Sequence, residues 1–416
     1  MPRVVIVTQN FPPDKLGNAS RIHDNGKQLV ETGWDVTVLC PPASFPFGQF
    51  DRSWTRTETQ SVDGITVRRL WTWQPETEDP GFLSRLAYYL FFAVHAMVWL
   101  LFARRKFDVI VTSSPPVFTG IAGLPFALAS RPPVVADVRD LWIDAAVSLD
   151  FIRENGVFER LSRRYERLFL QSVDQITVTT SVLESRLTAL YGIDPERVHH
   201  IPNGVNTSRF TPSETPDGPA IVYTGNVGYA QDLESCVRAM TQLESTDAVL
   251  KIVGDGDRRA ALEELVERKD LEDRVEFTGL LPRDRIPKLL DDAMIGVAPL
   301  KSTDALEYAV PTKAYEYMAC ALPVIATGTG EIESLLDRSG GGVVVDNDPA
   351  AIATEIDRLL SDDGEREAMG ERGREHVVRR YDRGAITRRL SDVFATACGT
   401  APSAGDRPKR PFEHRS

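Results

Sequence analysis

A lysine and a glutamate at the start of one predicted helix have the types and spacing to bind a nucleotide. Residues 310–326 predict a loop, a short helix and a buried strand, and Pro311 suits the first turn of that helix. Thr312 can cap the helix, and the free N–H groups of its first turn would bind a diphosphate, to which Lys313 adds a cation. Glu316, one turn further on the same face, could accept both ribose hydroxyls. The alternative is an ordinary surface helix.

A second polar group follows a predicted strand in the first half of the chain. Asp137, Arg139 and Asp140 come after the apolar run 134–136, at the strand end where doubly wound sheets bind their ligands. Asp140 could orient an acceptor hydroxyl or take its proton, and Ser114, at the end of another predicted strand, could line the same cleft. The alternative is a structural ion pair of Arg139 with Asp137 or Asp140.

Two successive series of short strands position these residues. The first series is predicted at 4–7, 35–39, 65–70, 109–112, 134–136 and 175–179. The second is predicted at 220–223, 248–253, 275–278, 295–298, 324–326 and 343–345. Helical patterns separate most of these runs, so each series predicts a doubly wound, mainly parallel sheet.

A chain of 416 residues suits two domains. We predict Rossmann-like domains over 1–200 and 219–383, joined by a polar, proline-containing hinge over 201–218. A further helix is predicted over 384–398, and one possibility is that it crosses back to the N-terminal domain. The polar end, 399–416, is predicted to be disordered.

Composition narrows the class of protein. The net charge is −12, with 60 acidic and 48 basic residues, which argues against a general nucleic-acid-binding protein. The hydrophobic share of 42% excludes bulk disorder. The four cysteines lie far apart and show no metal-ligand spacing, and the first residues lead straight into a strand, not a signal peptide. These features predict a cytoplasmic protein.

One segment, 86–103, is apolar except for His95 and is flanked by Arg85 and the basic residues 104–106. Three interpretations compete: a buried helix, an interfacial helix on a membrane, and a membrane span. A span is disfavoured because it would place the strands 4–7 and 109–112, which should share a sheet, on opposite sides. We predict that the helix holds the protein peripherally at the inner face of the cell membrane.

The stretch 310–326 resembles the motif P-S/T-K-x-x-E-Y-M-A-x-G-x-P-V-I of retaining glycosyltransferases of family 4. The resemblance covers most of the chain, because further family motifs follow in the right order at 10–17, 201–206, 224–231 and 253–256. The family implies the α/β fold called GT-B, in which two Rossmann-like domains face each other across a cleft. The subgroup most resembled makes surface polysaccharides and lipid-linked glycans.

The resemblance also assigns roles to residues. The N-terminal domain would bind the acceptor and the C-terminal domain the nucleotide-sugar donor. The donor-binding residues would be Asn226, Gly228, Gly254, Gly256, Arg258, Leu280, Arg283, Lys301, Thr312, Lys313 and Glu316. The acceptor-binding residues would be Gly17, Asn18, Ser114 and Asp137, and the catalytic residues Asp140, Arg139 and Glu316.

Two departures from the family pattern stand out. Many members carry two acidic residues eight apart; Glu316 fills the second position, but Tyr308 fills the first, with Glu307 one residue away. Many members also place an arginine and a lysine in the loop where this chain has Asn226 and Gln231 or Asp232. The phosphate charge must then be met elsewhere, and the candidates are Lys313, Lys301, Arg258 and Arg283.

The function implied is retaining transfer of a sugar, with N-acetylated amino sugars among the candidates. The donor would be a nucleotide diphospho-sugar and the acceptor a lipid-linked glycan or a polysaccharide. No metal and no other cofactor is expected, and the expected partners are donor, acceptor and membrane surface, not nucleic acid. The alternatives are a nucleotide-sugar 2-epimerase of the same fold and a catalytically idle sugar-nucleotide-binding partner.

Overall fold

The computed structural model describes residues 1–14, 17–45, 47–77, 79–129, 131–148, 152–212, 220–245, 247–303 and 306–400. The chain forms two compact units. The first consists of Met1–Val138, Arg164–Thr177 and the residues from Thr387 on, and the second of Arg139–Arg163 and Val178–Ile386. Residues 213–218 of the predicted hinge and 401–416 of the predicted tail lie outside the described residues.

The first series of strands builds an eight-stranded sheet in the order β3-β4-β2-β1-β5-β6-β7-β8. The strands are β1 Arg3–Val7, β2 Asp35–Cys40, β3 Thr57–Val62, β4 Ile65–Leu70, β5 Val109–Ser114, β6 Val134–Val138, β7 Gln175–Val178 and β8 Val198–His200. The associated helices are α1 Gly17–Glu31, α2 Phe82–Ala103, α3 Gly120–Ala129, α4 Trp142–Ser148, α5 Val157–Ser172 and α6 Ser181–Tyr191, with short 3-10 helices at Arg104–Lys106, Val117–Thr119 and Pro195–Arg197. Strand β1 pairs in parallel with β2 and β5, and β5 pairs in parallel with β6.

The edge strand β3 was not predicted. It pairs antiparallel with β4 through a hairpin at Asp63 and Gly64, whose φ angles of 48° and 81° fit the tight turn that an Asp-Gly pair favours. Its residues, TETQSV, are polar and mostly exposed, so it lacks the apolar run that marks the other strands. The Asp63-Gly64 pair was the feature of the sequence that could have predicted this hairpin.

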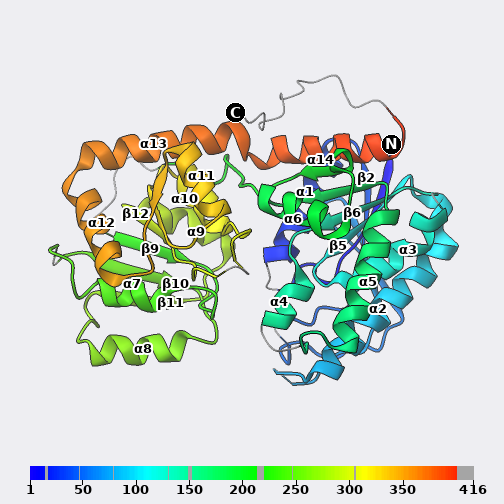
Figure 1. Ribbon diagram of the computed structural model, residues 1–416, viewed down its shortest axis with the longest axis horizontal. Helices are drawn as coiled ribbons and strands as arrows, with labels where there is room; N and C mark the ends of the chain where they lie inside the picture. The colour runs from blue at the N-terminus through cyan, green and yellow to red at the C-terminus, as the bar shows by residue number, and fades with distance from the viewer. Residues whose placement is uncertain are drawn as a thin grey trace. The chain divides into compact units, whose positions relative to one another are not determined.

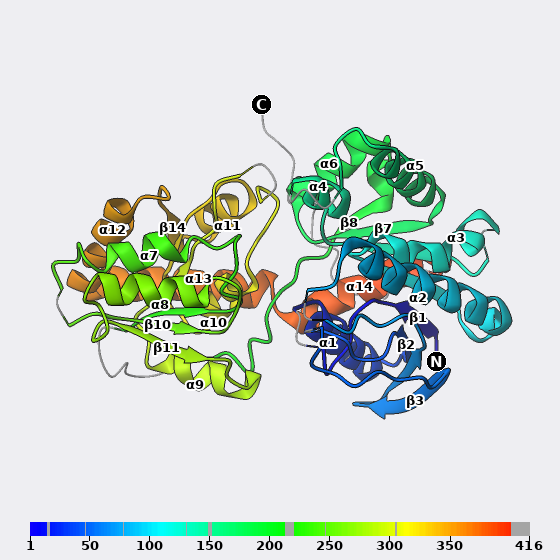
Figure 2. The ribbon, with the colours of Figure 1, turned by 90° about the horizontal axis from the view of Figure 1, so that it is seen from below.

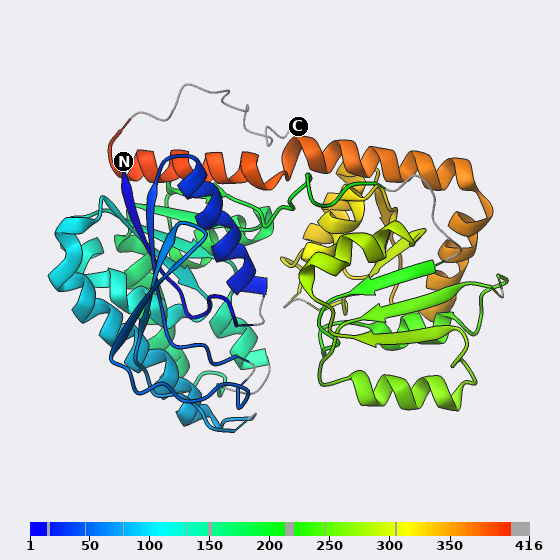
Figure 3. The same ribbon diagram turned by 180° about the vertical axis from the view of Figure 1, so that it is seen from behind.

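The second series builds a six-stranded sheet in the order β11-β10-β9-β12-β13-β14. Its strands are β9 Ala220–Thr224, β10 Val249–Val253, β11 Val275–Gly279, β12 Ile295–Ala298, β13 Val324–Ala326 and β14 Gly342–Val344. Its helices are α7 Leu233–Ala239, α8 Arg259–Arg268, α9 Ile286–Asp291, α10 Thr312–Ala319, α11 Glu331–Ser339, α12 Pro349–Ser361 and α13 Asp363–Arg380, with a 3-10 helix at Arg283–Arg285. All pairs in this sheet are parallel, and Figure 3 shows β9, β10 and β11 side by side as green arrows. The predicted fold class, two Rossmann-like parallel-sheet domains, is confirmed.

Helix α2 buries one face and exposes another. Phe92 and Leu100 have no exposed surface, whereas Phe91 is 54% and Phe102 is 89% exposed. The buried face packs against α3, which lies beside α2 in Figure 2. Helix α2 and the basic turn after it are the one described segment that is long and apolar enough, by length and composition alone, to cross a membrane.

The described residues end with two consecutive helices, α13 and α14 (Arg383–Ala397), drawn in orange and red in Figure 1. From Thr387 on, α14 belongs to the first unit. There the Trp34 indole donates a hydrogen bond of 2.8 Å to Ser391, and its ring meets Phe394 edge-on at 5.6 Å. These contacts tie the end of the chain to the turn before β2.

Candidate functional site

Two glycine loops at the carboxyl ends of β9 and β10 form the floor of the candidate donor site in the second unit. Gly225, Gly254 and Gly256 have φ angles of 134°, 145° and 158°, which residues with side chains rarely adopt. A Cβ atom on Gly254 would lie 1.8 Å from the carbonyl oxygen of Gly225. Backbone bonds from Gly225 to Val253 (2.9 Å) and from Val227 to Asp255 (3.0 Å) hold the loops together.

Helix α10 begins beside these loops. Pro311 is its N-cap residue and no side chain caps it, so the prediction that Thr312 caps the helix is wrong: Thr312 is the first helical residue. A proline side chain has no hydrogen-bonding group, so it leaves the N–H groups of the first turn without a side-chain acceptor. An N-terminus of this kind suits an anion, and the diphosphate site at this helix stays a prediction.

Lys313 is buried at the meeting point of α10 and the β9 loop. Its Nζ lies 3.9 Å from the centre of the Tyr223 ring and 3.2 Å from Oε1 of Gln231. The ammonium also lies against Gly225, where a Cβ atom would be 3.2 Å from Nζ. Burial lowers the pKa of Lys313 to about 7, and the nearby Glu316 carboxylate opposes that change. A phosphate bound here would supply the negative charge that favours the protonated lysine.

Glu316 is 6% exposed and accepts a 2.7 Å hydrogen bond from Arg283. The structure therefore brings together two of the predicted donor residues, but in an unexpected way. Arg283 was proposed to meet phosphate, whereas its guanidinium here meets the carboxylate assigned to the ribose. One carboxylate oxygen, Oε1, is engaged by this ion pair.

The other predicted donor residues surround the two loops. The Asn226 side chain lies between Gly228 and Gly256, since a Cβ atom on either glycine would touch its amide. Arg258 lies over the Tyr229 ring at 5.5 Å and is 3.5 Å from Glu234, so its guanidinium is already engaged. Lys301 is exposed and its N–H donates to the carbonyl of Ala230 at 3.1 Å, and Leu280 is 62% exposed directly after β11.

Asp140 is held by the residue that departs from the family pattern. The Tyr308 hydroxyl donates a 2.5 Å hydrogen bond to Oδ1 of Asp140, and both residues belong to the second unit. Burial raises the pKa of Asp140, while this hydrogen bond and the charge of Arg139 lower it. Glu307 does not replace the missing acid, because it pairs with Arg186 at 2.8 Å. No local pattern indicates the Tyr308–Asp140 contact, because it joins residues 168 positions apart in the chain.

Asp137 is a buried anchor in the first unit. Its carboxylate accepts hydrogen bonds from Arg21 (2.7 Å), Ser113 (3.1 Å) and Thr177 (2.9 Å). A direct contact with an acceptor would have to compete with these bonds, so the geometry favours a supporting role. Asp137 thus forms a structural ion pair, but its partner is Arg21, which was not among the residues considered.

Three polar residues, at the ends of β1 and β5 and at the start of α1, have buried side-chain atoms without hydrogen-bond partners among the described residues, and the first of them is a buried residue while the other two are half-buried. They are Gln9, Asn18 and Ser114. Gln9 follows β1 by two residues and Ser114 is the last residue of β5, and since these strands pair in parallel, both residues lie at the carboxyl ends of neighbouring strands. Asn18 comes from the first turn of α1, which begins at Gly17. Asn18 and Ser114 were predicted as acceptor residues, whereas Gln9 was not. Its position two residues after a predicted strand could have indicated that it lies at the ligand-binding end of the sheet.

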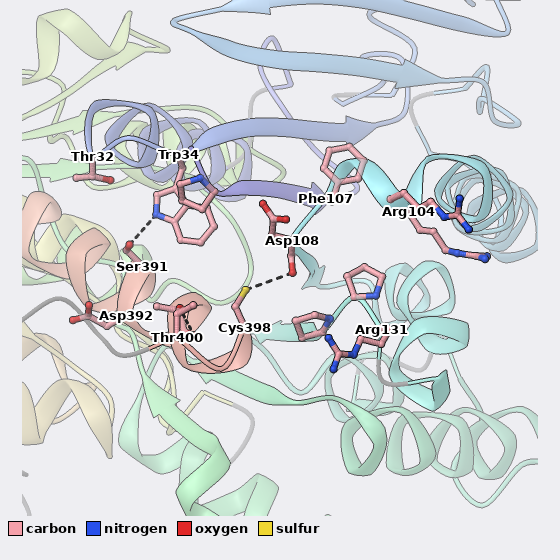
Figure 4. A pocket seen from close by; sticks show the side chains of 15 residues that line it. Thr32, Trp34, Arg104, Phe107, Asp108, Arg131, Ser391, Asp392, Cys398 and Thr400 are labelled. Atoms are coloured by element: carbon pink, nitrogen blue, oxygen red, sulfur yellow. Dashed lines mark hydrogen bonds between the residues drawn. The ribbon is translucent and has the colours of Figure 1, made fainter.

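A separate pocket of about 830 Å³ lies at the amino ends of the strands β1, β2, β5 and β6 of the first unit (Figure 4). Trp34, Asp108, Arg131 and Cys398 line it, and Arg104 joins them from the end of α2. Arg3 engages the Asp108 carboxylate at 2.9 Å, and the Cys398 thiol donates to the Asp108 carbonyl at 3.4 Å. None of the predicted site residues lines this pocket.

Comparisons with protein families give matches over most of the chain. Residues 17–204 match the glycosyl transferase 4-like domain, and residues 205–376 match the glycosyl transferases group 1 family. The putative colanic acid biosynthesis glycosyl transferase WcaI of Escherichia coli is 25% identical over 80% of this chain and 84% of its own. An uncharacterized glycosyltransferase, MJ1607 of Methanocaldococcus jannaschii, is 26% identical over 95% of this chain and 98% of its own.

Solved structures agree with the fold. Sucrose-phosphate synthase from Thermosynechococcus elongatus superposes with a TM-score of 0.76 at 21% identity, covering 95% of this chain and 99% of its own. Anabaena HepE, solved in complex with UDP-glucose, superposes with a TM-score of 0.70 at 14% identity, covering 95% of this chain and all of its own. At these identities the likeness concerns the fold.

Proposed function

Because the chain belongs to the group 1 glycosyltransferases of family 4, with the GT-B fold, we propose that it transfers a sugar from a nucleotide diphospho-sugar to a lipid-linked glycan or a polysaccharide, with retention of anomeric configuration. The observation that carries the proposal is the buried Lys313, which lies against the β9 glycine loop at an uncapped helix start. Such a site suits a diphosphate, since its backbone N–H groups are fixed before the ligand arrives and the bound diphosphate favours the protonated form of the lysine beside them.

The proposed reaction breaks the bond between the anomeric carbon and the diphosphate oxygen. Negative charge then grows on the leaving diphosphate, where Lys313 and the α10 N-terminus would stabilise it. The acceptor oxygen forms the new bond on the same face of the sugar, and its proton passes to a phosphate oxygen of the leaving group. The proposal includes no metal ion, because Lys313 and the N–H groups of α10 are proposed to stabilise the negative charge of the diphosphate.

Asp140 is proposed to orient the acceptor hydroxyl, with Tyr308 as its positioning residue. Arg139 would hold the Asp140 carboxyl ionised, since its charge lowers the pKa of that group. Gln9, Asn18 and Ser114 offer unsatisfied amide and hydroxyl groups at the strand ends of the first unit. Groups of this kind suit the hydroxyls of a glycan, because buried polar atoms without partners gain most from a polar ligand.

Two comparisons support the choice of substrates. HepE was solved with UDP-glucose, which supports a nucleotide-sugar donor, and WcaI is named for the biosynthesis of a polysaccharide, colanic acid. The exposed apolar face of α2 supports a location at the inner face of the membrane, where a lipid-linked acceptor would be reached.

The test is a transfer assay with the purified full-length chain, radiolabelled UDP- and GDP-sugars and a lipid-linked oligosaccharide in detergent. We expect label in the lipid, and Glu316→Gln should weaken donor binding roughly tenfold to a hundredfold, the loss of charge-assisted hydrogen bonds of about 1.5–3 kcal/mol. Glu264→Gln, on the exposed face of α8, is the matched control. Conversion of the donor sugar to its 2-epimer without transfer, or donor binding without turnover, would overturn the proposal.

A further inference from the structure

Three of the six tryptophans lie close together beside α2 in the first unit, and a fourth belongs to this helix. Trp54 stacks on Trp71 with ring centres 6.3 Å apart, and Trp71 meets Phe91 of α2 at 6.2 Å. Trp73 donates a 3.1 Å hydrogen bond to Ser84 in the first turns of α2, and Trp99 lies further along the same helix. We call Trp54, Trp71, Trp73 and Trp99 the tryptophan belt.

The belt adjoins the exposed apolar side chains of α2. These side chains recur at helical spacing over the length of the helix and form the α2 stripe: Leu83, Phe91, Val94, Val98, Leu101 and Phe102. Phe91 belongs to the stripe and touches the belt, so the two surfaces are continuous. Trp54 is 70% exposed and Trp73 is 39% exposed, which is unusual for residues of this size.

Arginines intersperse the belt. The Arg52 guanidinium lies 5.8 Å from the Trp54 ring centre and 5.1 Å from that of Trp73. Arg68 lies 5.3 Å from the Trp99 ring centre. Indole rings and guanidinium groups next to an apolar stripe are typical of protein surfaces that lie in the zone between lipid headgroups and acyl chains.

We propose that the tryptophan belt enters this interfacial zone of a bilayer and sets the depth at which the α2 stripe rests. The inference deepens the proposed function, on whose membrane location it rests. The helix would lie in the membrane plane, with the stripe facing the acyl chains and the indole N–H groups at the level of the headgroups. The exposed basic residues 104–106 at the end of α2 would meet the phosphates of anionic lipids.

A glycan is the other ligand that exposed tryptophans suit, and the geometry disfavours it. A sugar ring stacks on an open aromatic face. The Trp54 ring is instead occupied by stacking with Trp71 and by the Arg52 guanidinium, and Arg52 also lies against Trp73. These contacts take up ring surface on which a sugar would have to stack, which disfavours a stacking platform.

The first measurement uses the full-length chain and vesicles of phosphatidylcholine with phosphatidylglycerol. Lipids brominated at a shallow or a deep position of the acyl chain quench tryptophan fluorescence according to depth. We expect strong quenching by the shallow bromines and weak quenching by the deep ones. The signal of Trp54 and Trp73 is the difference between wild type and the Trp54→Ala/Trp73→Ala variant, because the other four tryptophans are present in both proteins.

The same variant tests the energetics. Trp54→Ala/Trp73→Ala should weaken partition into the vesicles about tenfold, which corresponds to about 1.4 kcal/mol. Val378→Ser, an exposed apolar position on α13, is the control and should partition like wild type. Circular dichroism checks the fold, and Trp54→Ala alone, at the most exposed belt position, provides a second variant if the double variant unfolds.

Unchanged partition of a folded variant, or quenching that is equal at both depths, would overturn the belt and leave the membrane location standing. Fluorescence that responds to soluble polysaccharide and not to vesicles would assign the belt to a glycan. A wild-type chain that does not bind vesicles would overturn both membrane inferences. Sugar transfer to the detergent-solubilised acceptor is measured separately, so the failure of the transferase proposal is distinguishable from each of these results.

Discussion

At the scale of single residues, the most consequential observation is the buried ammonium of Lys313. Burial lowers its pKa from an ordinary 10.5 to about 7. The folded chain therefore binds fewer protons at this group than the unfolded chain between these two values. This group's contribution to stability is most favourable above pH 10.5, falls as the pH drops towards 7, and is constant below.

We predict that diphosphate binding couples to proton uptake at Lys313. At pH 8 the free site is largely neutral, whereas a bound diphosphate favours the ammonium, so binding should take up close to one proton. Titration calorimetry of UDP and GDP in buffers of different ionisation enthalpy measures this uptake. Lys313→Met should abolish it and weaken binding, and Lys269→Ala, on the exposed end of α8, should leave both unchanged. Binding without proton uptake would remove Lys313 from the phosphate site.

Tyr308 offers a second prediction at this scale. Its hydroxyl donates to Asp140 and lowers the pKa of that carboxyl. In Tyr308→Phe the carboxylate loses a hydrogen bond of about 1.5–3 kcal/mol, so kcat should fall roughly tenfold or more while the donor Kd stays near that of wild type. The pKa of Asp140 should rise, which would move the acidic limb of the pH–kcat profile to higher pH.

Two further variants complete that experiment. Asp140→Asn should lower turnover more than Tyr308→Phe does and should leave donor affinity largely intact. Glu307→Gln is the neighbouring control, because Glu307 pairs with Arg186 in a half-exposed position. A pH profile that does not move in Tyr308→Phe would limit this tyrosine to a structural role.

At the scale of elements, the two glycine loops make a quantitative prediction. Alanine at position 254 places a methyl group 1.8 Å from the Gly225 carbonyl at a φ of 145°. Overpacking and backbone strain together should cost roughly 2–4 kcal/mol in thermal or chemical unfolding, and donor binding should be lost with the loop geometry. Gly364→Ala, in the first turn of α13 with its nearest neighbour at 3.5 Å, is the control and should be neutral or slightly stabilising. A Gly254→Ala variant as stable as wild type would contradict the close packing of the loops.

The elements also show which parts of the structure can be predicted from sequence. All strands of the second sheet were predicted, because each is a short apolar run between turns. Strand β3 was missed because an exposed edge strand has no such run. Helix α2 is apolar on all sides, so its sequence has no hydrophobic periodicity that would distinguish the buried Phe92 from the exposed Phe91. Only the packing against α3 shows which of the two is buried.

The same reasoning applies to the site. Lys313 and Glu316 could be predicted because they share one motif, and the glycine loops because their spacing is local. The partners of these residues could not. Arg283 reaches Glu316, and Tyr308 reaches Asp140, across 33 and 168 residues of sequence. Such pairs depend on how separate strands bring their loops together, which no local pattern records.

At the scale of the whole molecule, charge and apolar surface act together. The chain carries a net charge of −12, yet the three residues that follow α2 are basic and exposed. An acidic protein is repelled by anionic lipid unless a local basic group and an apolar surface face it. If the α2 stripe and these basic residues form the membrane-binding surface, the position of a charge on the protein should affect membrane binding more than the net charge does.

Two charge-matched variants test this. Arg104→Glu/Arg105→Glu and Arg268→Glu/Lys269→Glu each take the net charge from −12 to −16, the first at the end of α2 and the second at the end of α8. We predict that the first weakens partition into anionic vesicles at least about tenfold, since each basic residue near the surface contributes about 1 kcal/mol, and that the second has little effect. High salt should narrow the difference without releasing all of the wild-type chain, because the apolar contribution of α2 is not screened. Equal losses in both variants would show that only the net charge matters, and the basic end of α2 would then have no place in membrane binding.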